Sequence, residues 1–141
     1  MEIRVAQGPE DLAAALAVRR VVFIEEQSVP EDEEVDGLDP QCLHLVALLD
    51  GRVVGTARLL EKAGRAKAQR VAVLKELRGT GVGRRLMERL HAEAAARGHR
   101  EITLGAQLSA LGFYEGLGYT AEGAVFMDAG IPHRTMRRAL P

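Results

Sequence analysis

The apolar positions along the first third of the chain predict one strand and one helix. Residues 2–5 alternate in polarity and favour a short strand, and a helical stripe of apolar residues then runs from Pro9 to Phe23. Pro9 suits the first turn of a helix, and the acidic residues after it complement the positive end of the helix dipole. The stripe ends between Gln27 and Pro30. Residues 31–41 are acidic and are predicted to form a loop.

The middle of the chain predicts a meander of three strands. Residues 42–49 are apolar on both faces, which is typical of a central strand covered on both sides. The dipeptide Asp50-Gly51 favours a two-residue hairpin turn. The returning strands are predicted over residues 52–61 and, after a turn at Gly64, over residues 67–74.

The last part of the chain contains the clearest helix. Residues 81–97 place their apolar side chains on one face, and Gly98 suits the end of the helix. A strand over 101–104, a short helix over 108–117 and a last hairpin over 119–126 are predicted after it. Helices that follow an antiparallel meander indicate an α+β fold with a mixed sheet. Because no repeat or linker is visible, we expect a single domain, 1–141.

Composition places the chain among ordinary globular proteins. Its 141 residues are 47% hydrophobic and 28% charged. No apolar run reaches the ~18 residues of a membrane span, and the first residues lack the pattern of a signal peptide. A lone cysteine, Cys42, can form neither an internal disulfide nor a thiolate metal site. We therefore expect a cytoplasmic protein without a membrane partner.

The net charge of −1 hides two oppositely charged segments. Residues 21–51 carry nine acidic and no basic side chains, and residues 52–100 carry thirteen basic and four acidic ones. The segments are thus about −9 and +9. A basic segment suggests an anionic ligand and an acidic one a cationic ligand. The alternative is that both are solvated surfaces. A pI of 6.4 and 4% aromatic residues argue against nucleic-acid binding.

The segment with the clearest chemistry runs from Arg78 to Gly83, with the sequence R-G-T-G-V-G. It follows a predicted strand and begins the best helix. Glycines let a ligand approach the backbone, and free N–H groups at a helix start bind anions. The segment therefore predicts a phosphate or pyrophosphate cradle. It is neither a Walker P-loop, since no Gly-Lys-Ser/Thr follows, nor a G-x-G-x-x-G dinucleotide fingerprint.

With a second block, the chain resembles the GNAT N-acetyltransferase superfamily. Residues 107–119 read Q-L-S-A-L-G-F-Y-E-G-L-G-Y. They are similar to the family pattern N-x-x-A-x-x-F-Y-x-x-x-G-F, with Gln107 in place of Asn and Tyr119 in place of Phe. Residues 18–30 and 130–133 resemble the small bacterial ElaA/YjcF-type acyltransferases. The resemblance implies the GNAT fold, in which helices flank a mostly antiparallel mixed sheet that splays between strands 4 and 5.

The resemblance also implies a site for acetyl-coenzyme A between the two splayed strands. The backbone around Val71, Ala72 and Val73 would pair with the pantetheine arm, and the Val73 N–H would polarise the thioester carbonyl. Gln107 would contact the same arm. The pyrophosphate would be held by the backbone of residues Arg78, Gly79, Thr80, Gly81, Val82, Gly83 and Arg84.

Tyr114 matches the general acid of the family, which would protonate the departing thiolate. A general base for the protonated acceptor amine is expected as well, and the residues leave several alternatives open. The first candidates are Glu26 and His133. Glu26 is expected at the end of the first helix, and His133 in a loop. The rivals that remain are Glu25, Glu34, Asp36, Asp128 and His44.

These expectations add up to an N-acetyltransferase that moves an acetyl group from acetyl-CoA to a small amine by direct attack in a ternary complex. A homodimer is compatible with the resemblance. No metal is expected, because the His and Asp positions show no ligand spacing, and Cys42 is a poor covalent carrier at the start of an apolar strand. The alternatives are a non-catalytic acyl-CoA-binding sensor and an interaction module that has lost the cofactor.

Overall fold

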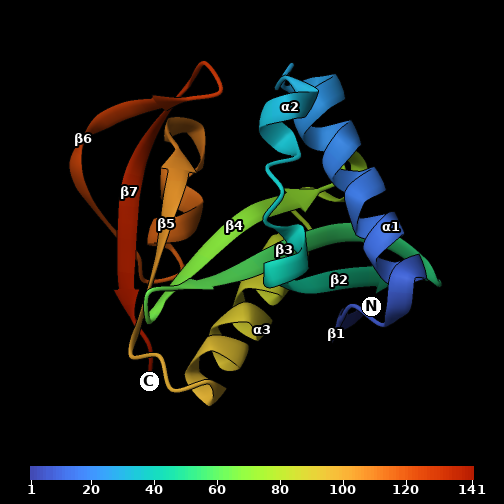
Figure 1. The fold of residues 1–141 in the computed structure, drawn as a ribbon, viewed down its shortest axis with the longest axis horizontal. Coiled ribbons are helices and arrows are strands. Elements are labelled where there is room, and N and C mark those ends of the chain that lie inside the picture. Colours follow the sequence, from blue (N-terminus) through green and yellow to red (C-terminus); the bar gives the residue numbers. More distant parts are fainter.

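Seven strands form one twisted sheet in the computed structural model, which describes residues 1–141 (Figure 1). The sheet order is β1-β2-β3-β4-β5-β7-β6. The strands are β1 (Glu2–Val5), β2 (Leu43–Leu49), β3 (Arg52–Lys62), β4 (Arg65–Val73), β5 (Glu101–Gln107), β6 (Thr120–Asp128) and β7 (Ile131–Ala139). All neighbours are antiparallel except β4 and β5, which are parallel. The predicted α+β class with a mixed sheet is confirmed.

Two long helices lie on opposite faces of the β2–β4 part of the sheet (Figure 1). The helices are α1 (Gly8–Arg19), α2 (Glu31–Glu34), α3 (Val82–Ala96) and α4 (Leu111–Glu115). A π-helical segment, Arg20–Glu26, continues α1, and short 3₁₀ turns occupy Asp39–Gln41, Lys75–Leu77 and Leu108–Ala110. The predicted cover on both sides of the first meander strand is confirmed, because five successive β2 residues are buried.

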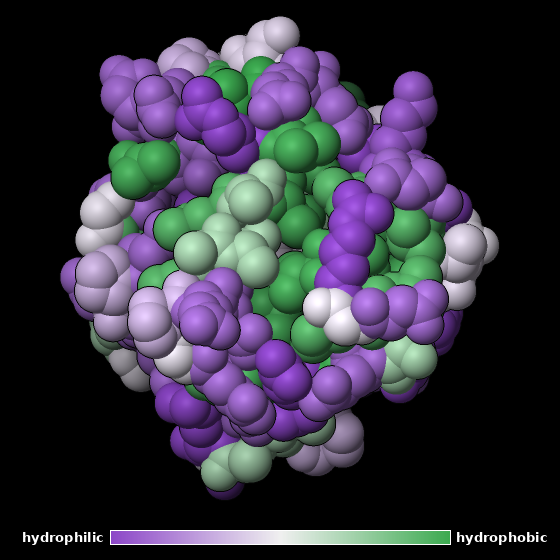
Figure 2. Space-filling view, turned by 90° about the vertical axis from the view of Figure 1, so that its right-hand side faces the viewer, coloured by the Kyte–Doolittle hydropathy of each residue, from purple (hydrophilic) through white to green (hydrophobic).

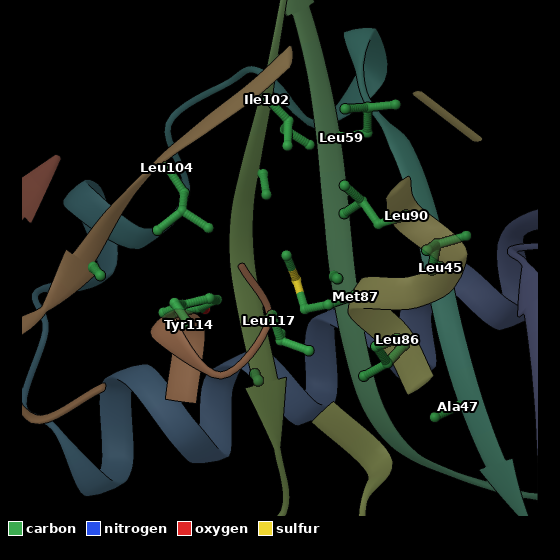
Figure 3. Packing of buried hydrophobic residues seen from close by; sticks show 14 of the residues in the cluster. Leu45, Ala47, Leu59, Leu86, Met87, Leu90, Ile102, Leu104, Tyr114 and Leu117 are labelled. Carbon is green, nitrogen blue, oxygen red and sulfur yellow. The ribbon is translucent and has the colours of Figure 1, made fainter. Parts of the chain in front are cut away.

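The main core lies between α3 and the sheet (Figure 3). Leu86, Met87 and Leu90 of α3 are fully buried and point toward the strands, as their spacing of three and four residues requires. Gly55 in β3 admits the helix closely, since a Cβ there would lie 3.1 Å from Leu86 and from Val82. On the opposite face, a smaller cluster joins Ala15 of α1 to β2.

The sheet opens between β4 and β5. Only two residue pairs, Ala66 with Ile102 and Lys67 with Thr103, join the two strands. Beyond Lys67 the strands diverge, and Figure 1 shows β5 leaning away from β4 toward β7. The predicted splay is confirmed, and it leaves the second half of β4 without a neighbour on one edge.

Two local predictions are wrong. Residues 31–41 are not a plain loop, because they hold α2 and a 3₁₀ turn packed onto the sheet. The last hairpin is not 119–126 but pairs β6 with β7 through a turn at Ala129 and Gly130. His133 therefore lies in β7 rather than in a loop. Pro132 hid this strand from the sequence pattern, because a proline within a segment argues against a strand. As the second residue of β7, however, it interrupts few hydrogen bonds between the strands.

The face that α1 turns to solvent is mixed in character. Figure 2 shows hydrophobic residues gathered near its centre, with hydrophilic ones around them. No helix of the structure is both long and apolar enough to cross a membrane.

Candidate functional site

The opening between β4 and β5 forms a cleft of about 440 Å³. Its walls come from the π-helical segment, β4, β5, the start of α4 and the β6–β7 hairpin. The residues that the argument uses are Gln27, Glu34, Arg70, Val71, Ala72, Val73, Arg78, Gln107, Tyr114, Asp128 and His133. Seven of the residues predicted for acetyl-CoA binding or catalysis thus line one cavity, together with the rival bases Glu34 and Asp128, whereas Glu26 and residues 79–84 do not line it.

The end of β4 turns one peptide group toward the cleft. The Leu74 N–H donates to the Val54 carbonyl of β3 at 2.9 Å. Because successive residues of a strand face opposite edges, Val73 points its N–H and carbonyl away from β3. The Val73 carbonyl accepts a hydrogen bond from Arg78 Nε at 3.0 Å on that cleft side. The Val73 N–H on the same edge can donate to an oxygen in the cleft.

The glycine turn after β4 gives α3 an uncapped N-terminus. Gly79 and Gly81 have φ angles of +80° and +93°, and a Cβ at either would meet nothing within 4 Å. Gly81 is the N-cap, so no side chain covers the first N–H groups of the fifteen-residue helix. Free N–H groups and the helix dipole favour an anion at this place. The residues therefore fit a pyrophosphate, and Val82 through Arg84 supply the N–H groups.

Gly83 has a different role from the other two glycines. A Cβ there would lie 3.2 Å from Phe113 Cζ, so this glycine lets the aromatic ring of α4 pack against α3. The side chain of Arg84 reaches the Gly116 carbonyl at 3.3 Å, away from the cleft. Packing against Phe113 therefore explains the glycine at position 83, and the positive backbone φ explains the glycines at positions 79 and 81.

Arg78 and Glu26 form an ion pair beside the cleft. Arg78 Nη2 donates to Glu26 Oε2 at 2.8 Å. Arg78 lines the cleft, whereas Glu26, the last residue of the π-helical segment, is exposed and is not among the lining residues. Glu26 thus holds a guanidinium that borders the cleft.

Tyr114 lies in α4 with its ring directed toward β4 (Figure 3). The ring packs edge-on against Phe113 and Tyr119, with centroids 4.9 and 5.7 Å away. Burial raises the pKa of Tyr114 to about 12. The phenol therefore stays protonated at neutral pH and is available as a donor at the wall of the cleft.

His133 presents one ring nitrogen as an acceptor. Its Nδ1 lies 2.7 Å from the Ile131 carbonyl, and a carbonyl only accepts, so Nδ1 carries the proton. The lone pair is then on Nε2. The ring is stacked on Phe126 at 5.6 Å and lines the cleft.

Two further predicted residues have different surroundings. Gln107, at the end of β5, lines the cleft and donates to Gln27 Oε1 at 2.8 Å, so its amide connects two walls. His44 does not line the cleft. Its Nε2 donates to the Asp39 carbonyl at 2.9 Å, while Nδ1 is buried without a partner. A histidine sealed in this way is badly placed for catalysis.

Three acidic residues of the negative segment are paired with three arginines of this chain. Glu34 binds Arg19 at 2.9 Å and Arg70 at 2.8 Å. Asp36 and Asp39 bind Arg58 at 2.6 and 2.9 Å. We call these six residues the arginine–acid network. For residues 21–51 the sequence left open a site for a cationic ligand and a solvated surface; these three carboxylates are instead paired with arginines of this chain.

The network also explains the acidity of its carboxyl groups. Hydrogen bonds from Arg58 hold the pKa of Asp36 far below its usual value, against the effect of burial. Burial acts to raise the pKa of Asp39, but hydrogen bonds from Arg19 and Arg58 leave it lowered. The lowered pKa makes Asp36 a poor base, and both oxygens of the Glu34 carboxylate are already hydrogen-bonded to arginines. Asp128 still lines the cleft, whereas Glu25 is exposed and does not.

Sequence reasoning missed Gln27 and Arg70 as parts of the cleft wall. Gln27 lies within residues 18–30, which carry part of the family resemblance, but no role was assigned to it, and it follows directly on the π-helical segment. Arg70 lies in the strand before the glycine turn and belongs to neither of the two GNAT motifs. No group of three or more His, Cys, Asp or Glu side chains is arranged to hold a metal ion.

Comparison with known proteins supplies the family. The model of an acetyltransferase (GNAT) domain matches residues 12–140. YjcF of Bacillus subtilis (strain 168), an uncharacterized N-acetyltransferase, is 39% identical over 139 residues, which cover 98% of this chain and 99% of that protein. ElaA of Escherichia coli (strain K12) is 32% identical over 132 residues, covering 90% of this chain and 86% of ElaA.

Solved structures agree with these relatives. An acyl-CoA N-acyltransferase from Pseudomonas aeruginosa superposes with a TM-score of 0.87 at 32% identity, covering 99% of this chain and 100% of that one. An aminoglycoside 6'-N-acetyltransferase complexed with coenzyme A superposes with a TM-score of 0.82, covering 100% and 98%. At 19% identity the second likeness is one of fold.

Proposed function

Because the chain belongs to the GNAT acetyltransferase family, we propose that it is an N-acetyltransferase that moves an acetyl group from acetyl-CoA to the amine of a small molecule. The observation that carries this proposal is the cleft between β4 and β5. Its walls hold a backbone N–H at Val73 and a protonated phenol at Tyr114, and Arg78 in the wall is followed in sequence by the glycine turn and the uncapped start of α3, which would take a pyrophosphate.

The chain's own residues would hold the donor along the edge of β4. Bound acetyl-CoA supplies an acetyl group that is activated as a thioester. The N–H groups of Val82 through Arg84 would bind its pyrophosphate, and the charge of Arg78 would add to their attraction for the anion. The pantetheine arm would run along Val71 and Val73, and Gln107 would contact it from β5.

Three groups would act on the reacting atoms. The Val73 N–H would donate to the acyl oxygen, where negative charge develops during attack. The Tyr114 hydroxyl would donate to the departing sulfur. Because its pKa of about 12 exceeds the roughly 8.5 of a thiol, Tyr114 would act as a hydrogen-bond donor to the departing sulfur and would keep its own proton.

The proton of the acceptor amine needs a base. We propose His133 for this role, since the residue lines the cleft and its Nδ1 is held by the Ile131 carbonyl, which leaves the lone pair on Nε2. Glu26 is the alternative, but its carboxylate is bound to Arg78.

Two measurements test the proposal. Calorimetric titration with coenzyme A should show one binding site per chain. Release of free thiol from acetyl-CoA should then depend on an added amine from a panel of cationic and neutral primary amines. Binding without amine-dependent thiol release would favour an acyl-CoA sensor, and absence of binding would reject both.

A further inference from the structure

Arg70 has an unusual backbone conformation for a residue inside a strand. Its φ angle is +53°, in the region that favours glycine. The other non-glycine residues with positive φ are Ser28, Asp50, Ala63 and Ala129, and all of them lie in turns or loops. A strained residue in the middle of β4 persists only where its surroundings hold it.

The pairing of β3 with β4 explains why the strain is there. Arg58 lies opposite Gln69, and Thr56 lies opposite Ala72. Two steps along β3 thus correspond to three steps along β4. One extra residue, at Arg70 and Val71, is inserted in β4 as a β-bulge.

The bulge decides which peptide group faces the cleft. If the pairing of Arg58 with Gln69 continued without the extra residue, Val73 would lie opposite Val54. The Val54 carbonyl would then accept from Val73, whereas in the structure it accepts from Leu74 at 2.9 Å. The bulge therefore turns the Val73 N–H from β3 toward the cleft.

The Arg70 side chain is held by Glu34. Arg70 Nε donates to Glu34 Oε2 at 2.8 Å, and Nη2 donates to the carbonyls of Glu33 and Glu34 and, on the exposed side, to Asp36 Oδ2, each at 3.2 Å. Glu34 is only 3% exposed and is also bound by Arg19, which is 1% exposed. Arg19 of α1 thus fixes the position of the Glu34 carboxylate, and Arg70 binds the carboxylate in that position.

We propose that Glu34 is a positioning residue that acts through Arg70: it holds the bulge in β4 and so keeps the Val73 N–H directed into the cleft. The catalytic consequence rests on the proposed function, in which this N–H donates to the acyl oxygen. The direction of the N–H is a property of the free protein, so it can be measured without any ligand.

Substitution of Arg70 gives a matched pair of variants. Arg70→Gly and Arg70→Ala both remove the guanidinium, but only glycine adopts a positive φ without strain. We expect Arg70→Ala to lower kcat by at least tenfold more than Arg70→Gly, with KM for acetyl-CoA changed less than threefold between the two. Equal kcat values would overturn the proposal, since loss of the network alone affects both variants alike.

Glu34→Gln tests the other partner, with Glu31→Gln as its control. Glu31 lies in the same helix and pairs with Arg20 in solvent. We expect Glu34→Gln to lower kcat by about 10²-fold, which is typical of losing one oxyanion donor, and Arg70→Gly in that background to restore most of it. Failure of the glycine to restore kcat in a folded Glu34→Gln protein would count against the proposal.

Amide hydrogen exchange in the free protein separates this inference from the proposed function. In the wild type, the Leu74 amide should be protected and the Val73 amide should exchange quickly. In Arg70→Ala, Leu74 should lose protection by at least tenfold, while Arg70→Gly should keep it. Unchanged exchange of the Leu74 amide in Arg70→Ala would refute the proposal that Glu34 holds the bulge through Arg70. The expected exchange pattern in a protein that fails to transfer acetyl groups would instead refute the proposed function.

Discussion

Arg78 connects Glu26 to Val73. Its Nη2 donates to the Glu26 carboxylate at 2.8 Å, and its Nε donates to the Val73 carbonyl at 3.0 Å. Because the side chains of Arg78 and Glu26 are 44% and 28% exposed, the pair contributes only about 0–1 kcal/mol to the stability of the fold. Its main effect is to keep a positive charge at the cleft, close to the glycine turn.

Replacement of Arg78 should therefore affect ligand binding more than folding. We expect Arg78→Ala to weaken coenzyme A binding at least about tenfold, because a hydrogen bond to a charged group contributes about 1.5–3 kcal/mol. Calorimetric titration measures this change. Arg20→Ala, which breaks another exposed ion pair, is the control and should bind like the wild type. Equal affinities in the two variants would show that Arg78 does not touch the ligand.

The two open glycine positions provide a test of the pyrophosphate cradle. Gly81→Asp should abolish measurable coenzyme A binding, because it places bulk and negative charge at the start of α3. Gly64→Asp is a matched control, since Gly64 also has a positive φ and open space around its Cα but lies in the β3–β4 turn. Both variants suffer a similar backbone strain. If the titration shows equal losses in both, strain and not the cradle explains the effect.

Tyr114→Phe should lower kcat about 10²-fold, in the range for loss of a general acid or donor. The affinity for coenzyme A should change much less, because the ring and its contacts with Phe113 and Tyr119 remain. Steady-state rates and a titration on the same preparation give both numbers. Unaltered kcat would remove Tyr114 from the chemistry.

The pH dependence of kcat/KM distinguishes the two candidate bases. If His133 accepts the proton of the amine, His133→Gln should abolish the acidic limb of the kcat/KM profile. Glu26→Gln should keep this limb, but it should weaken coenzyme A binding because Arg78 loses its partner. A double variant, Glu26→Gln with Arg78→Ala, should then bind no worse than Arg78→Ala alone. Loss of the limb in Glu26→Gln would reverse the assignment.

His91 should make the fold sensitive to mild acid. Burial, with a smaller contribution from Arg138, lowers the pKa of His91 to about 4 from 6.5. Between these values an unfolded chain takes up a proton that the folded one refuses, so the free energy of unfolding falls as the pH falls. The loss is at most about 3 kcal/mol. Urea unfolding at pH 7.5 and 4.5 should show a smaller loss for His91→Gln, and an equal loss would exclude this histidine.

The strands and helices with a strong apolar period were predictable. The splay between β4 and β5 and the pyrophosphate cradle were predicted from two motifs, residues 78–83 and 107–119, each of which is short and continuous in sequence. The order of elements and most of the cleft wall could therefore be predicted as well. By contrast, β7 carries three arginines and a proline, and only its packing against β5 and β6 reveals it as a strand. Its two buried residues, His133 and Met136, are three positions apart and lie on opposite faces of the strand, so no alternating apolar pattern marks it.

The arginine–acid network could not be predicted for a different reason. Its pairs join residues that are 15 to 36 positions apart, such as Arg19 with Glu34 and Arg70 with Glu34. Charge totals show that two segments are opposite in sign, but they do not show which carboxylates are buried together with which arginines. The backbone strain at Arg70 is likewise invisible in sequence, because arginine is not a residue that marks a positive φ.

The arginine–acid network also sets an order of events for a chain that leaves the ribosome. Residues 31–41 emerge before Arg58 and Arg70, so Asp36 lacks both of its arginine partners, and Glu34 has only Arg19, until β3 and β4 have emerged. Contacts between residues close in sequence form with the smaller loss of loop entropy. Because β3 and β4 are joined by a short turn, we expect this hairpin to form first and the segment around α2 to dock on it afterwards.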